Sequence, residues 1–226
     1  MTHTDTHEQT IVDVWQGHAE PWTRAVREGR IESRRLVTDA AIVRAVLALA
    51  PHSALDIGCG EGWLARCLAE EGIRPTGVDM VPELIEAARA HGGDFRTLSY
   101  AELAQGALGD ARFDVAVCNF SLLGKQSVDE LLKAMPVLLH AGGSLVVQTL
   151  HPCAIAEGVY GDGWREGSWV GCGEGFGQAA PWYFRTFAGW QATFAAAGLF
   201  ISGLDEPVHP HTGRPVSIVF TLRAHI

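Results

Sequence analysis

The chain has 226 residues, 47% of them hydrophobic and 19% charged, so it can fill the core of one α/β domain with a covering segment. Its 17 basic and 26 acidic side chains give a formal charge of -9, which disfavours a nucleic-acid partner because phosphates would be repelled. No apolar run approaches the roughly 20 residues of a membrane span, and the polar first ten residues show no secretory signal, so we expect a cytoplasmic protein that contacts no membrane.

The cysteine and histidine pattern predicts no metal site. The cysteines are odd in number and form no CxxC pair, so they are expected to be buried thiols at positions 59, 67, 118, 153 and 172. His209 and His211 flank a proline and lack a third ligand, which favours a loop.

The first part of the chain, residues 1–50, is predicted to form a layer of helices. Ile11, Val14 and Trp15 recur at helical spacing, and Thr38 with Asp39 is expected to cap a helix that stops at Pro51.

Short apolar, β-branched segments then alternate with helical ones. The predicted strands cover residues 54–58, 75–79, 114–119 and 143–150, and the predicted helices cover 63–72, 82–92 and 127–142. This alternation predicts a mainly parallel sheet, with residues 51–150 as a cofactor-binding core.

Residues 151–187 are rich in glycine and aromatic side chains and are too long for an ordinary connection. We expect this segment to act as a mobile lid that also contacts the substrate. Residues 188–226 close the domain with a helix at 190–199, an extended segment and a last strand at 216–224. The whole chain is therefore predicted to be a single domain.

A glycine loop follows the first predicted strand. Asp56 ends that strand, Gly58, Gly60 and Gly62 follow at alternate positions, and a helix starts at once. Such a loop lets backbone amides approach a ligand closely, and the helix start favours an anionic group. A dinucleotide fingerprint needs a third glycine where this chain has Trp63, which weighs against NAD.

Asp79 ends the second predicted strand and is followed by Met80. A carboxylate at this place can accept both hydroxyls of a ribose. Asp79 could also cap the helix that starts at Pro82, and the two roles can coexist.

Together these motifs resemble those of the class I S-adenosylmethionine-dependent methyltransferases. The resemblance rests on DIGCGEG at 56–62, Asp79, FDVAVCNFSLLG at 113–124 and LLHAGGSLVVQTLHP at 138–152. It implies a doubly wound, Rossmann-like, seven-stranded and mainly parallel sheet of order 3-2-1-4-5-7-6, with strand seven antiparallel. The cofactor, S-adenosyl-L-methionine, would lie across the ends of strands one, two and four, and S-adenosyl-L-homocysteine would be the product.

The resemblance also implies roles for individual residues. The loop glycines and Cys59 would line the methionine part, Asp56 would support its ammonium, and Asp79 would hold the ribose. Arg34 or Arg35 could neutralise the cofactor carboxylate or could form a solvated helix face, and we favour Arg34. The implied cofactor set is Arg34, Asp56, Gly58, Cys59, Gly60, Gly62, Asp79, Met80, Ser99, Tyr100, Asn119 and Phe120. Ser99 and Tyr100 stand where the family usually has an acid near the adenine, and Asn119 and Phe120 stand beside the sulfonium.

Candidates for catalysis and substrate contact lie in the lid. His151 directly follows the fifth predicted strand and could serve as a general base, or it could only order the turn into Pro152. Aromatic side chains could form a cage for a flat or cationic substrate, or the lid's own packing core; they are Tyr160, Trp164, Trp169, Trp182 and Tyr183. Arg185 could bind a substrate carboxylate.

We therefore expect a methyltransferase that acts on an O, N or C atom of a small organic molecule. Two alternatives stay open: an NAD-dependent oxidoreductase, which Trp63 and the lack of a Tyr-x-x-x-Lys dyad disfavour, and a methyltransferase-like domain that binds without catalysis.

Overall fold

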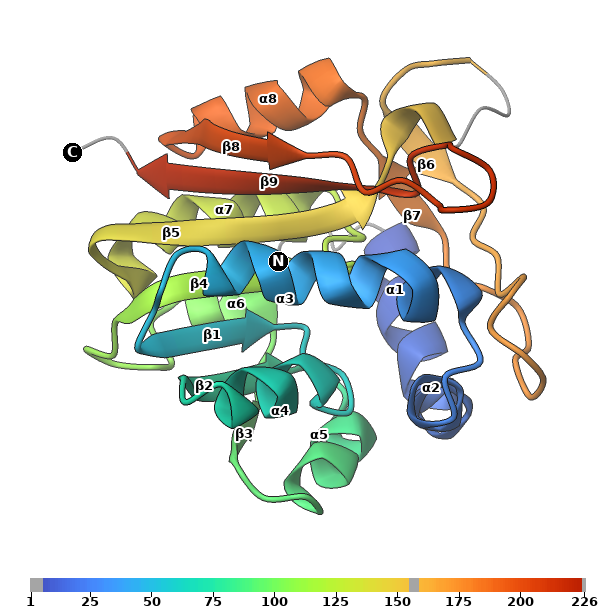
Figure 1. The fold of residues 1–226 in the computed structure, drawn as a ribbon, viewed down its shortest axis with the longest axis horizontal. Coiled ribbons are helices and arrows are strands. Elements are labelled where there is room, and N and C mark those ends of the chain that lie inside the picture. The colour runs from blue at the N-terminus through green and yellow to red at the C-terminus, as the bar shows by residue number, and fades with distance from the viewer. Residues whose placement is uncertain (1–5, 155–158, 225–226) are drawn as a thin grey trace.

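A seven-stranded sheet forms the centre of the molecule in the computed structural model, which describes residues 6–154 and 159–224 (Figure 1). Its strand order is β3-β2-β1-β4-β5-β9-β8. The strands are β1 (Ser53–Ile57), β2 (Arg74–Asp79), β3 (Asp94–Thr97), β4 (Phe113–Asn119), β5 (Leu139–Leu150), β8 (Leu199–Asp205) and β9 (Ser217–Ala224). Two further short strands, β6 (Gly163–Arg165) and β7 (Trp182–Phe184), pair with each other outside this sheet.

The strand order confirms the predicted topology. Because β6 and β7 form their own sheet, β8 and β9 are the sixth and seventh strands of the main sheet in chain order. Strand β9 lies between β5 and β8, as predicted for strand seven. Strands β1 to β5 are parallel, whereas β9 runs antiparallel to both β5 and β8. The carboxyl ends of the parallel strands therefore meet at one edge of the sheet.

Helices cover both faces of the sheet, as the apolar spacing requires. One face packs against α3 (Asp39–Leu47) and α4 (Trp63–Glu70), through side chains such as Ile42 and Leu68. The other face packs against α7 (Gln126–Leu138) and α8 (Phe187–Ala196), through side chains such as Leu131 and Phe194. Short helices complete the layers: α5 (Pro82–Arg89), α6 (Tyr100–Ala104) and the 3-10 turn η2 (Pro152–Ala154).

The N-terminal layer contains α1 (Thr6–Gly17), α2 (Ala19–Arg27) and the π-helical turn η1 (Arg34–Thr38). The predicted cap at Thr38 was wrong, because η1 continues directly into α3 and the Thr38 side chain forms no capping hydrogen bond. Thr38 is buried instead.

The helix predicted to reach residue 142 ends earlier. Helix α7 stops at Leu138 and β5 begins at Leu139, opposite Phe113 of β4. Pro136 lies in the last turn of α7 and has no N–H to continue the helical ladder, so a helix is easily ended there.

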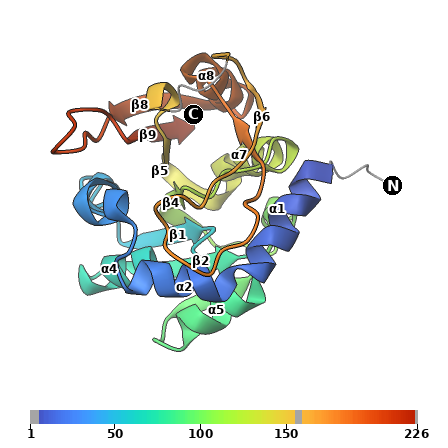
Figure 2. The same ribbon diagram turned by 90° about the vertical axis from the view of Figure 1, so that its right-hand side faces the viewer.

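Helices α1 and α2 and the segment that carries β6 and β7 all lie beside the edge where the parallel strands end (Figure 1). Figure 2 views the molecule from this edge and shows that segment running from near α8 toward α2. No helix among the described residues is long and apolar enough to cross a membrane.

Candidate functional site

The glycine loop is held against β2 by its own backbone. Gly58 and Cys59 both donate their amides to the carbonyl of Val78, at 2.8 and 3.0 Å. All three glycines of the loop have positive φ, between +57° and +82°, a region that other residues enter only at a cost. The strand-loop-helix geometry predicted for residues 56–63 is therefore present.

The three glycines face different neighbours. A side chain at Gly58 would collide with Ser121, and one at Gly60 would point at the indole nitrogen of Trp22. A side chain at Gly62 would enter the core beside Phe95. The lack of a side chain at Gly62 therefore makes room for Phe95, and a cofactor contact through its backbone stays a prediction.

Asp56 is buried with an unsatisfied carboxylate. Its residue is 1% exposed, and Oδ2 has no hydrogen-bond partner among the described residues. Burial, reinforced by the charge of Asp79, raises the pKa of Asp56 to about 7. A buried carboxylate in this state favours a positively charged neighbour, so the site suits an ammonium group.

Asp79 joins the glycine loop to the start of α5. Its Oδ2 accepts from the amide of Gly60 at 2.9 Å, and its Oδ1 accepts from the amide of Val81 at 3.0 Å. Burial raises the pKa of Asp79. A carboxylate can accept about four hydrogen bonds, so these two leave acceptor capacity for ligand hydroxyls.

The end of β4 is strained at the position predicted to lie beside the reacting centre. Phe120 has φ +54°, one of two non-glycine residues with positive φ in the described chain. Its amide donates to the carbonyl of Gln148 at 2.8 Å, which holds it there. Beside it, Oδ1 of Asn119 is buried and has no partner among the described residues. Strained backbone of this kind concentrates at functional sites.

The glycine loop, Asp56 and Asn119 line one cavity of about 50 Å³, whereas Asp79 and Phe120 do not line it. Six of the predicted residues line it, namely Arg34, Asp56, Gly58, Cys59, Gly60 and Asn119. Trp22 and Val26 of α2 also line it, and sequence reasoning missed them because nothing in their local pattern shows which strand end α2 crosses.

Arg34 reaches this cavity from η1. Its Nε donates to Oδ1 of Asp39 at 2.8 Å, and its guanidinium lies 5.0 Å from the ring centroid of Trp63 and 5.9 Å from that of Trp22. The structure thus places Arg34 where a cofactor carboxylate is expected, and Arg35 does not line this cavity.

Six of the twelve predicted cofactor residues do not line the cavity. Asp79 and Phe120 adjoin residues that do, Gly62 packs beside Phe95, and the other three are Ser99, Tyr100 and Met80. Ser99 caps α6, where it accepts from the amide of Glu102 in a capping box. The Tyr100 hydroxyl donates to the carbonyl of Ser121 at 2.8 Å, and burial raises its pKa. Met80 is 36% exposed. None of the three lines the cavity around Asp56, and the first two have hydrogen bonds within the protein.

His151 is buried, and both of its ring nitrogens have partners. Nδ1 accepts from the amide of Cys153 at 3.2 Å, and Nε2 lies 2.7 Å from Oε1 of Glu206. Because Nδ1 accepts, Nε2 carries the proton and donates it to the carboxylate. His151 therefore orders the turn after β5, and Glu206, 55 residues away, gave no local sign in the sequence.

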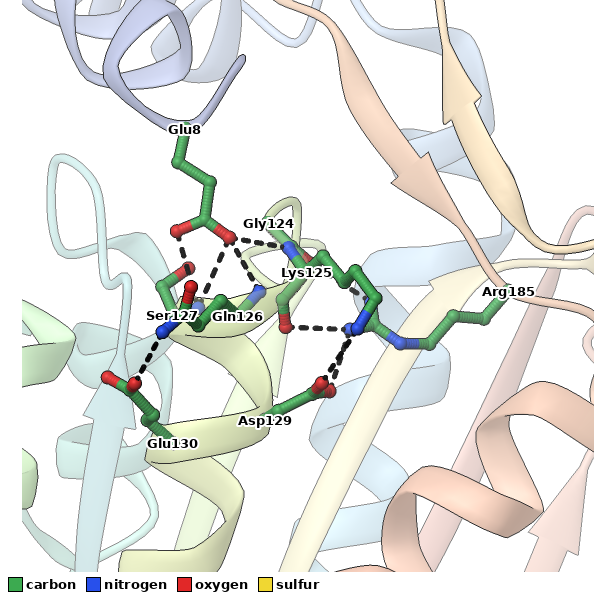
Figure 3. Close-up of polar contacts among 8 residues, drawn as sticks. All are labelled: Glu8, Gly124, Lys125, Gln126, Ser127, Asp129, Glu130 and Arg185. Carbon is green, nitrogen blue, oxygen red and sulfur yellow. Dashed lines mark hydrogen bonds and ion pairs between the residues drawn. The ribbon is translucent and has the colours of Figure 1, made fainter. Parts of the chain in front are cut away.

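Arg185 is buried and bonded to the start of α7 (Figure 3). Its side chain is 1% exposed and donates to the carbonyls of Gly124 and Lys125 and to the carboxylate of Asp129, at 3.0 to 3.1 Å. The geometry assigns Arg185 a structural role at the start of α7, in place of the predicted contact with a substrate carboxylate.

The start of α7 also receives a carboxylate from α1. Glu8 Oε1 accepts from the amides of Lys125, Gln126 and Ser127, at 2.8, 2.6 and 3.2 Å (Figure 3). A negative charge is favourable at this end of a helix because the first amides lack partners. Sequence reasoning missed this contact, because its partners lie more than 115 residues apart.

The side chains predicted to form an aromatic cage lie in separate groups. Trp164 stacks on His7 with centroids 4.5 Å apart and meets Tyr183 edge to face at 5.5 Å. Trp169 instead packs against Trp15 and Phe176, at 5.3 and 4.6 Å.

The remaining aromatic candidates form a group of their own, because Trp182 and Phe184 lie on the opposite face of β7 from Tyr183. Tyr160 accepts from the amide of Phe187 and packs near Phe184, which Trp182 meets edge to face. Of these groups, only the one around Trp169 contacts a residue that lines the cavity around Asp56. The ring centroids of Trp169 and Trp22 lie 6.3 Å apart, and Trp22 lines the cavity.

Residues 55–147 match the family model of a methyltransferase domain. Over 127 residues the chain is 36% identical to the ubiquinone biosynthesis O-methyltransferase of Xanthomonas oryzae pv. oryzae, an alignment that covers 53% of this chain and 52% of that protein. The chain thus matches about half the length of these curated relatives.

Solved structures share the fold over most of the chain. The 1,6-didemethyltoxoflavin-N1-methyltransferase of Burkholderia thailandensis aligns with a TM-score of 0.69 and 21% identity, covering 100% of this chain and 93% of that one. An S-adenosylmethionine-dependent methyltransferase of Mesorhizobium loti aligns with a TM-score of 0.62 and 21% identity, covering 80% and 96%. The predicted resemblance to class I methyltransferases is confirmed at the level of the domain and its fold.

Proposed function

We propose that this chain, which carries the class I methyltransferase domain, transfers a methyl group from S-adenosylmethionine to an O, N or C atom of a small organic molecule. The observation that carries the proposal is the pair of unpartnered buried oxygens, on Asp56 and Asn119, that face one cavity beside the glycine loop. Buried polar atoms without partners in the protein indicate a ligand that supplies them.

The residues present fit this cofactor. Asp56 would neutralise its ammonium, Arg34 its carboxylate, and Asp79 would accept from its ribose hydroxyls. When bound, S-adenosylmethionine supplies a methyl group on a positively charged sulfur. Asn119 and Phe120 would hold the reacting end, and Trp22 would exclude water from it.

The acceptor needs alignment and, for an O or N atom, loss of a proton. We assign proton removal to His151. Glu206 would act as its positioning residue, because it holds the Nε2 proton and leaves Nδ1 as the accepting atom. Nδ1 would have to exchange the amide of Cys153, now 3.2 Å away, for the acceptor, at the cost of one hydrogen bond.

Calorimetry with S-adenosylmethionine, S-adenosylhomocysteine and NAD tests the cofactor. We expect binding of the first two and none of NAD. NAD binding alone would support the oxidoreductase alternative and would overturn this proposal.

Turnover on a panel of hydroxylated and amino-substituted metabolites tests catalysis. With an accepted substrate, His151→Ala should lower kcat about 100-fold while cofactor affinity stays unchanged. Glu206→Gln, which keeps a hydrogen-bond acceptor for Nε2, should lower it less. A His151→Ala enzyme of full kcat would remove the base from the mechanism.

The binding-only alternative has its own supporting observation, since both ring nitrogens of His151 are bonded within the protein. Cofactor binding without turnover of any panel member would favour it over catalysis.

We also infer a cytoplasmic location, a single domain and a small-molecule partner. The five cysteines are all free thiols, which a reducing compartment preserves. Fractionation of cells that express the tagged chain would test the location.

A further inference from the structure

A second, larger cavity adjoins the one around Asp56. Its volume is about 340 Å³, within the range of small-molecule sites in proteins. It lies between α2, η1 and α4, and four lining residues belong to both cavities: Val26, Arg34, Glu61 and Trp63. The function proposed above leaves this space unused.

Arginines dominate the charged lining. Arg27, Arg34, Arg35 and Arg66 surround the cavity, against two carboxylates, Glu61 and Asp39. Five of the chain's arginines fall between residues 24 and 35, although the whole protein carries a formal charge of -9. A local excess of positive charge in an acidic protein points to an anionic ligand.

Internal ion pairs account for only part of this charge. Glu61 is 1% exposed and binds both Arg27 and Arg66, at 3.0 and 2.7 Å. Oδ1 of Asp39 accepts a hydrogen bond from Nε of Arg34, the one Arg34 nitrogen that bonds to it. Within residues 6–154 and 159–224, no carboxylate lies within ion-pair distance of Arg35. The guanidiniums of Arg34 and Arg35 therefore keep donors for a ligand.

The backbone that carries these two arginines is unusual. Residues Arg34–Thr38 form a π-helical turn, a rare geometry that is frequent at functional sites. The turn brings both Arg34 and Arg35 to the cavity. The remaining walls are apolar, from Ala25, Val26 and Ile31, with the ring of Trp63 beside them.

We propose that this cavity binds a small organic anion, with a carboxylate or phosphate group held by Arg34 and Arg35 and an apolar body against Ile31 and Trp63. The ligand is separate from the cofactor, whose carboxylate would reach Arg34 from the first cavity. Because Arg34 serves both cavities, the two ligands would influence each other's affinity. The binding itself does not depend on methyl transfer and can be measured without it.

The test is calorimetric titration with phenyl phosphate, at low salt and in saturating S-adenosylhomocysteine, with phenol and inorganic phosphate as comparison probes. We expect phenyl phosphate to bind, phenol not to bind, and inorganic phosphate to bind at least tenfold more weakly because it lacks the apolar body. Equal binding of inorganic phosphate would overturn the organic-ligand assignment.

Arg35→Gln removes one of the two proposed ligand-binding charges at an exposed position. It should weaken phenyl phosphate at least tenfold, the loss of about one charge-assisted hydrogen bond. Arg30→Gln is the matched control, because Arg30 belongs to the same basic segment, pairs with Glu28 and does not line the cavity. The control should change binding less than about twofold.

Three results would overturn the proposal: no binding of phenyl phosphate in saturating S-adenosylhomocysteine, equal losses in the two variants, or, in a separate series, a phenyl phosphate affinity that keeps falling as S-adenosylhomocysteine is raised instead of levelling off. The last result would make the cavity an extension of the cofactor site. If NAD or nothing bound at the first cavity while phenyl phosphate still bound here, the methyltransferase proposal would fail and this site would stand.

Discussion

The two sides of the candidate site use their polar groups in opposite ways. On the glycine-loop side, Asp56 and Asn119 keep buried oxygens without partners in the protein. On the lid side, both ring nitrogens of His151 have partners within the protein, and Arg185 donates three hydrogen bonds within it. An unsatisfied group is ready to bind a ligand, whereas a satisfied group must first give up a partner, so the two sides call for different tests.

The largest expected effect is on the glycine-loop side. Gly60→Val should abolish cofactor binding, with no signal below about 1 mM S-adenosylhomocysteine in calorimetry. A branched residue resists φ +57°, and its side chain would point toward Trp22 across the cavity. Gly106→Val is the control, since Gly106 has φ +85° and open space around it. Equal affinities in the two variants would contradict the loop assignment.

On the lid side, Arg185→Ala should cost about 3 kcal/mol of unfolding free energy, because it leaves Asp129 and two carbonyls without their donor. Denaturant unfolding measures this, and a double-mutant cycle with Asp129→Asn isolates the ion pair. Unchanged stability combined with a raised substrate KM would restore the predicted substrate role.

Asp79→Ala should weaken S-adenosylhomocysteine by about 2 kcal/mol, roughly 30-fold, through loss of charge-assisted hydrogen bonds. The same change also frees the amide of Gly60, so a ligand control is needed. The 2′-deoxy analogue should bind the wild type more weakly than the parent compound does but bind Asp79→Ala equally well. If the 2′-deoxy analogue still bound Asp79→Ala more weakly than the parent compound does, a ribose contact by Asp79 would be excluded.

Cofactor affinity should depend on pH through Asp56. The free protein has a pKa of about 7 for this group, and an ammonium ligand favours its charged form, so binding releases a proton. Affinity for S-adenosylhomocysteine should therefore rise about tenfold from pH 6 to pH 8 and level off above. Asp56→Asn should flatten the curve, and a flat wild-type curve would place the ammonium elsewhere.

The smallest effect concerns the contact between α1 and α7. Glu8→Gln keeps an acceptor but removes the charge, so it should cost about 0.5 to 1 kcal/mol and lower the Tm by roughly 1 to 4 °C. Gln9→Ala, on the exposed side of the same helix, is the control. A larger loss than that of Arg185→Ala would reverse the ranking of the two contacts.

The predicted mobility of the lid stays a prediction. The described part of the segment is joined to the rest by the pairing of β6 with β7 and by the bond from the amide of Tyr183 to the carbonyl of Leu123. Amide exchange with and without cofactor and substrate would measure it. Residues 155–158 of the predicted lid lie outside the described residues.

The order of the sheet was expected from the family resemblance. The sequence alone determined the alternation of strands and helices, the glycine loop and the acids at 56 and 79. These features depend on neighbours within a few residues, because strand periodicity, positive φ and strand-end positions are local properties. Gly62 shows the limit, since the sequence placed it directly before a helix, while the side chain beside it, Phe95, belongs to another strand.

Tertiary structure decided which side chains remain free for a ligand. Glu8 and Ser127, His151 and Glu206, and Arg185 and Gly124 are pairs whose members are 55 to 119 residues apart, so no local pattern could reveal them. The same holds for α2, which brings Trp22 over the glycine loop. The free energy of a buried polar group depends on every neighbour that packs against it, and those neighbours are known only once the chain has folded.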